Sequence, residues 1–138
     1  MKLGITGSRS ITDFDFYPYF TLKDASFRRF CRTYGSRRGR ITTVFSGGAA
    51  GVDSSAFLAA ERLSIRNVVF LPDRVRHPGR LFLRSYQERN ERIVDSCDLM
   101  LAVWNGTSHG TRNAIRYARK VKKPVYLVLP EGKISIFA

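Results

Sequence analysis

The chain has 138 residues, with 24 lysines and arginines against 11 aspartates and glutamates, and therefore a net charge of +13. This length predicts one domain, residues 1–138, with a buried core, and so basic a domain favours partners that carry phosphate. No apolar stretch approaches the roughly 20 residues of a membrane-spanning helix and no Cys/His cluster is present, so we expect a cytoplasmic protein with no metal and no membrane partner.

The first half of the chain alternates between strand and helix patterns. An apolar strand is predicted at residues 2–6, and helical spacing follows over residues 15–34, where Pro18 favours two shorter helices. A basic turn then leads to a β-branched and aromatic strand at residues 41–45 and to a helix at residues 51–63.

The second half continues this alternation. A strand at residues 68–71 precedes an irregular loop at residues 74–84 and a helix at residues 86–97. The last elements are a strand, a helix, a strand and a tail that forms either an edge strand or a subunit contact, at residues 99–104, 111–122, 125–129 and 131–138. The pattern predicts an α/β fold with a single Rossmann-like, doubly wound, mainly parallel five-stranded sheet and helices on both faces.

Three glycine-bearing segments follow predicted strands, at residues 4–13, 45–53 and 104–111. Ligands of open α/β sheets bind beyond the carboxyl ends of the strands. Glycine there lets backbone N–H groups point at an anion, and a helix that starts at this point favours negative charge through its dipole. Three such segments in one chain predict a phosphate-binding crevice.

The middle segment has the strongest local pattern. Gly47 and Gly48 offer amides without side-chain obstruction, and Ser46 adds a hydroxyl donor. Asp53 either accepts from a ribose hydroxyl or stabilises the N-terminus of the next helix.

The first and third segments add donors and a cation. Arg9 can bind phosphate with two N–H groups, beside the turn and hydroxyl of Gly7 and Ser8. Thr111 is either a donor to the ligand or only a helix cap. The third segment as a whole supplies the anion-site candidates Gly106, Thr107, Ser108, Gly110 and Thr111.

Arg89 and Asn90 lie on the helix before the fourth strand. Arg89 can pair with phosphate and Asn90 can read a base edge, although a solvated helix face explains the same residues. His109 is better suited to positioning than to catalysis, because no triad or paired-carboxylate spacing accompanies it. The catalytic residues are therefore unknown, and whether the protein is an enzyme stays open.

The last helix has basic residues that are candidates for nucleic-acid contacts: Arg112, Arg116, Arg119, Lys120 and Lys123. Further arginines cluster at residues 28–40 and 74–84. If these clusters share one face, they form a track for a phosphate backbone; if they are spread around the molecule, they do not.

The motifs, in this order, resemble the SLOG superfamily and most of all its YspA-like group. The matching motifs are Gly7-Ser8-Arg9, Ser46-Gly47-Gly48 with Gly51 and Asp53, Arg89-Asn90, and Gly110-Thr111. The resemblance implies a Rossmann-like fold that binds a nucleotide or nucleotide-derived small molecule at these residues, as a sensor or a processing hydrolase. It also implies a homo-oligomer, with a dimer expected.

Two more distant relatives sharpen the alternatives. Similarity to the DNA-processing protein DprA implies that the chain binds single-stranded DNA or RNA through its arginine clusters. The chain also resembles the LOG phosphoribohydrolases, but Ala114 stands where their Gly-Thr-x-x-Glu motif carries a carboxylate. Phosphoribohydrolase activity is therefore not expected.

Overall fold

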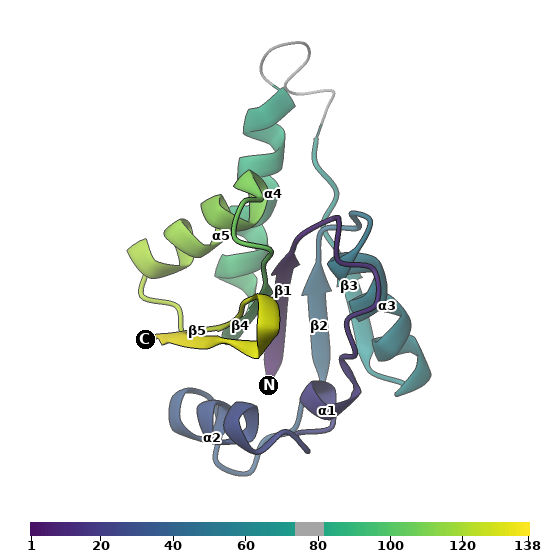
Figure 1. Ribbon diagram of the computed structural model, residues 1–138, viewed down its shortest axis with the longest axis vertical. Helices are drawn as coiled ribbons and strands as arrows, with labels where there is room; N and C mark the ends of the chain where they lie inside the picture. Colours follow the sequence, from purple (N-terminus) through teal and green to yellow (C-terminus); the bar gives the residue numbers. More distant parts are fainter. Residues whose placement is uncertain (74–81) are drawn as a thin grey trace.

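Figure 1 shows a computed structural model that describes residues 1–73 and 82–138. One sheet lies between two layers of helices, as expected for an α/β chain. In chain order the elements are β1 (Lys2–Gly7), α1 (Tyr17–Phe20), α2 (Ala25–Tyr34), β2 (Thr43–Ser46), α3 (Val52–Arg62), β3 (Arg66–Val69), α4 (Phe82–Ser96), β4 (Leu99–Val103), α5 (His109–Lys120), β5 (Val125–Val128) and β6 (Ile134–Phe137).

Within residues 1–73 and 82–138 the sheet has six strands, in the order β3-β2-β1-β4-β5-β6, so the expected number of five is wrong. The first five strands are parallel and follow the order of a Rossmann fold. The extra strand is the tail, which runs antiparallel to β5 with Val125 opposite Phe137 and Val128 opposite Ile134. The prediction that the tail forms an edge strand is therefore confirmed. The tail can pair with the outer edge of β5, and successive side chains of the tail point to opposite faces of the sheet.

The two faces of the sheet bury different helices. In β4, Leu99, Leu101 and Val103 face a core shared with α1, α2 and α3, whereas Met100 and Ala102 face a core shared with α4 and α5. All five residues of this strand are buried, as is typical of a parallel strand covered on both sides.

Several boundaries differ from the sequence-based prediction. Pro18 does mark two helices, since it lies in the first turn of α1 and α2 begins separately. Helix α4 starts at Phe82, within the stretch predicted as a loop, while residues 74–81 lie outside the described residues. Strand β3 begins at Arg66, because an edge strand tolerates exposed polar side chains. No helix of the described ranges has both the length and the apolar character that crossing a membrane requires.

Candidate functional site

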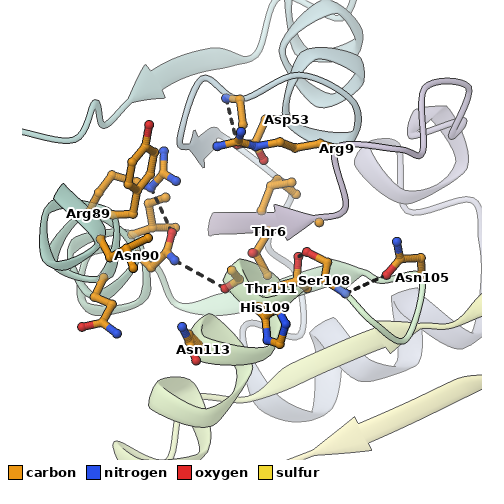
Figure 2. A pocket seen from close by; sticks show the side chains of 18 of the residues that line it. Thr6, Arg9, Asp53, Arg89, Asn90, Asn105, Ser108, His109, Thr111 and Asn113 are labelled. Atoms are coloured by element: carbon orange, nitrogen blue, oxygen red, sulfur yellow. Dashed lines mark hydrogen bonds between the residues drawn. The ribbon is translucent and has the colours of Figure 1, made fainter. Parts of the chain in front are cut away.

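A cavity of about 720 Å³ opens at the carboxyl end of β1. In the sheet, β1 lies between β2 and β4, which is the point where the strand order reverses. Its walls come from the end of β1, the turn before α3, one face of α4 and the N-terminus of α5, as Figure 2 shows. We call this cavity the crevice. The sequence-predicted site residues that line it are Gly7, Arg9, Asp53, Arg89, Asn90, Ser108, Gly110 and Thr111.

The other predicted site residues lie outside the lining: Ser8, Ser46, Gly47, Gly48, Gly106 and Thr107. Ser46 is the last residue of β2 and is buried. Ser8 is also buried, and its Oγ accepts a hydrogen bond of 2.9 Å from the backbone N–H of Asn105. Asn105 in turn donates from Nδ2 to Ser10 Oγ at 3.1 Å. These bonds tie the first glycine segment to the third.

Asn105 also shapes the loop that leads into α5. Its Oδ1 accepts from the backbone N–H groups of Thr107 and Ser108, each at 2.9 Å. An Asn side chain that bonds the backbone two or three residues ahead forms a tight turn. Trp104 completes the turn by donating from Nε1 to the carbonyl oxygen of Ser108 at 2.9 Å. Helix α5 therefore begins at the rim of the crevice.

The N-terminus of α5 forms one wall of the crevice. Ser108 is the N-cap, so the alternative that Thr111 is the N-cap is wrong; Thr111 lies in the first turn, with its Oγ1 3.4 Å from Ser108 Oγ. The N–H groups of a first helical turn have no partner within the helix. A Cβ added at Gly110 would meet no atom within 4 Å, so the backbone at this end of α5 is open on that side.

Arg89 is the central cation of the site. It is only 8% exposed, and it donates from Nη1 to the carbonyl oxygen of Gly47 at 2.6 Å and from Nε to Asn90 Oδ1 at 2.9 Å. A Cβ at residue 47 would collide with the guanidinium group. Gly47 thus lets Arg89 reach the backbone of the β2–α3 turn, a structural role that the sequence pattern did not indicate.

Asp53 is the acidic counterpart of this cation. It is 7% exposed, and its Oδ2 accepts from the backbone N–H of Ala49 at 3.2 Å. Burial raises the pKa of Asp53, and the Ala49 N–H and the positive charges of Arg89 and Arg9 partly oppose that rise. Burial likewise lowers the pKa of Arg89, which the charge of Asp53 counteracts. Each group therefore favours the charged form of the other.

The raised pKa of Asp53 predicts a specific pH dependence. The folded state binds this proton more tightly than the unfolded state, so the free energy of unfolding falls as pH rises from about 4 towards the folded-state pKa. In Asp53→Asn this contribution to the slope is absent, and we expect a shallower decline in urea unfolding measured between pH 4 and 7. The control is Asp13→Asn, which removes an exposed carboxylate from a nearby loop and should keep the wild-type slope. Parallel curves for all three proteins would contradict the assignment.

Tyr86 is a site residue that the sequence analysis missed. Its ring lies close to two guanidinium groups, with centroid distances of 5.9 Å to Arg9 Cζ and 5.4 Å to Arg89 Cζ. The sequence does contain a pattern that indicates this residue. Four crevice residues of α4 are spaced at i, i+3, i+4 and i+7 and therefore share one face of the helix. These residues are Leu83, Tyr86, Gln87 and Asn90.

The basic residues of α5, together with Lys123 three residues after its end, divide into two groups. Arg112 lies over the Trp104 ring at 5.7 Å and Arg119 over the Phe137 ring at 4.5 Å, while Lys123 Nζ donates to the carbonyl oxygen of Cys97 at 2.6 Å. These three cations therefore contact their own chain. The other two, Arg116 and Lys120, line a groove of about 290 Å³ between α4 and α5.

Comparison with known sequences gives one short match. No protein-family model matches the chain. Over 43 residues it is 40% identical to an uncharacterized SPbeta prophage-derived protein, YoqJ, of Bacillus subtilis (strain 168). The matched stretch is 31% of this chain and only 25% of that relative's length.

Comparison with solved structures is more extensive. DNA processing protein A (DprA) from Streptococcus pneumoniae matches 92% of this chain with a TM-score of 0.61 and 15% identity, and the chain spans 50% of its length. DprA from Helicobacter pylori, described in its single-stranded DNA binding mode, matches 98% of the chain at a TM-score of 0.58 and 20% identity, over 68% of its own length. The chain therefore has a Rossmann-like fold similar to that of DprA.

Proposed function

We propose that the crevice binds a nucleotide or a nucleotide-derived phosphate ligand, for which the protein is a sensor or a processing hydrolase. One observation carries the proposal: the N-terminus of α5 and the guanidinium groups of Arg9 and Arg89 line the same cavity of about 720 Å³. Helix N-termini and arginines both bind phosphate oxygens. A volume of this size is within the usual range for small-molecule sites.

The remaining lining residues suit the other parts of a nucleotide. Tyr86 offers an aromatic surface for a base. Asn90 and Asp53 carry the amide and carboxylate oxygens that read a sugar or a base edge. In this proposal the phosphates contact Ser108, Gly110 and Thr111 as well as the arginines. Gly47 and Ser8 do not contact the ligand, but they accept hydrogen bonds from Arg89 and Asn105 and so hold these two residues in place.

Gly110→Asp tests the proposal directly. The position is open, so the fold should be retained, but the new carboxylate would lie where the phosphate binds. We expect the wild type to bind at least one ligand among mono- and dinucleotides, cyclic nucleotides and ADP-ribose. At 100 times its Kd, this ligand should stabilise the folded state by about 2.7 kcal/mol. In a thermal-shift panel that stabilisation should vanish in Gly110→Asp.

The matched control is Gly110→Asn, which has the same shape without the charge and should keep a thermal shift. An equal ligand-induced shift in Gly110→Asp and Gly110→Asn would show that the N-terminus of α5 does not bind the ligand's phosphate. No shift with any small nucleotide in the wild type would remove the proposal altogether.

A second candidate function is binding of single-stranded DNA or RNA. The observation that favours it is the net charge of +13, which a small nucleotide does not require. The similar fold of Helicobacter pylori DprA, described with its single-stranded DNA binding mode, points in the same direction. A thermal shift given only by an oligonucleotide, and fading as salt rises, would favour this candidate over the first.

A further inference from the structure

A second basic surface lies on α2 and the loop after it, at the end of the sheet opposite the crevice (Figure 1). It forms a groove of about 700 Å³, which we call the α2 groove. Its lining residues are Ala25, Arg28, Arg29, Arg32, Thr33 and Arg37. Four of the six carry a positive charge, so an anion is the ligand that this lining fits.

The arginines of the α2 groove are not neutralised by acidic side chains. In residues 1–73 and 82–138, no carboxylate lies within 4.0 Å of Arg29, Arg32 or Arg37, all of which are exposed. The nearest acidic residue along the helix is the N-cap, Asp24, whose carboxylate already accepts from the backbone N–H of Phe27 at 2.8 Å. The groove therefore keeps its positive charge.

Structural roles explain only part of this cluster. Arg28 donates to the carbonyl oxygen of Leu22 at 3.1 Å, and Arg32 lies in the last turn of α2, where a cation favours the helix dipole. Arg29 and Arg37 have no comparable intramolecular contact within the described ranges. Like charges one helical turn apart, as in Arg28 and Arg32, also destabilise a helix unless an anion lies between them.

We propose that the α2 groove binds the phosphate backbone of single-stranded nucleic acid. Several guanidinium groups in a row match a chain of phosphates better than a single small anion. This proposal rests on the second candidate function given above, the binding of single-stranded DNA or RNA, and assigns the phosphates of that strand to the α2 groove.

The α2 groove is separate from the crevice. The loop that carries Arg37 ends beside the start of β1, where the amino group of Met1 donates to the carbonyl oxygen of Arg40 at 2.6 Å. Gly7, at the other end of the six-residue strand, lines the crevice. At about 3.3 Å per residue the two ends lie about 20 Å apart. A mononucleotide in the crevice cannot reach the α2 groove, so each site can be removed without the other.

The test measures fluorescence anisotropy of a labelled thymidine oligonucleotide of about 20 nucleotides, long enough to cover a typical single-strand site, over a range of salt concentrations. The variant is R29A/R32A/R37A, and the control is R62A/R66A/K133A, which also removes three exposed positive charges. We expect the α2 variant to bind about tenfold or more weakly, with the slope of log affinity against log salt smaller by about 2, since each phosphate contact on a single strand contributes about 0.7. The control should stay close to wild type.

Three results would overturn the proposal. Equal weakening in both triple variants would show that only the total charge matters. Unchanged binding in R29A/R32A/R37A, with loss in Gly110→Asp, would move the nucleic-acid site to the crevice. Competition by duplex DNA as strong as that by the single strand would exclude a single-strand site. Because the α2 groove lies outside the crevice, these results stand independently of nucleotide binding there.

Discussion

Gly51→Ala is expected to lower the free energy of unfolding by about 4 kcal/mol, from backbone strain and overpacking together. Gly51 caps α3 with φ 76° and ψ −121°, a conformation that residues with a Cβ rarely adopt. A Cβ at this position would also collide with the carbonyl oxygen of Arg9. Because the collision is with backbone, no side-chain rotation relieves it. Urea unfolding followed by circular dichroism measures the loss.

The control for this prediction is Gly110→Ala. Gly110 lies in the first turn of α5, and an added Cβ would meet nothing within 4 Å. Since alanine favours a helix over glycine by up to about 1 kcal/mol, this variant should be as stable as the wild type or slightly more stable. Similar unfolding midpoints for the two variants would show that the α3 N-terminus tolerates a side chain and that the close approach of Arg9 to Gly51 is not required.

Arg89→Met is expected to lower the free energy of unfolding by about 3 kcal/mol at pH 7. Methionine keeps much of the side-chain volume but leaves the buried carbonyl oxygen of Gly47 without its donor. It also removes a positive charge that lowers the pKa of Asp53. The pKa of Asp53 should then rise further, so the destabilisation should be smaller at pH 4, where the carboxyl group can be protonated, than at pH 7.

The matched control is Arg92→Met on the same helix. Arg92 is exposed and its Cζ lies 4.7 Å from the centroid of the Phe70 ring, so its loss should remove no more than about 1 kcal/mol. Urea unfolding of both variants at pH 4 and pH 7 gives the comparison. If Arg89→Met and Arg92→Met lose the same stability at both pH values, Arg89 does not act as the countercharge of Asp53.

Much of the fold could be predicted from short-range patterns. Strand β4 is apolar throughout because both faces are covered, and Pro18 separates α1 from α2 because proline suits a first helical turn. The edge strands were harder to predict from such patterns. Arg66 in β3 and the half-exposed residues of β6 lack the apolar signal of a central strand, so β3 was placed two residues late and the sixth strand remained one of two alternatives.

The site was less predictable, because its key contacts join distant parts of the chain. Arg89 and Gly47 are 42 residues apart, and their hydrogen bond gives Gly47 a supporting role that a glycine motif alone cannot reveal. Asn105 and Ser8 are 97 residues apart. By contrast, Tyr86 lies on the same helical face as Asn90, a spacing that local reasoning could have used.

The hydrogen bonds between Asn105 and the Ser8–Ser10 turn have a consequence for the speed and strength of association. They join the two loops on either side of the β1–β4 boundary before any ligand arrives. A loop that is already ordered loses little conformational entropy when it closes on an anion, so little of the interaction energy is spent on rearrangement. Association with the crevice should then occur in one kinetic step whose rate rises linearly with ligand concentration, without the plateau that a slow loop closure imposes.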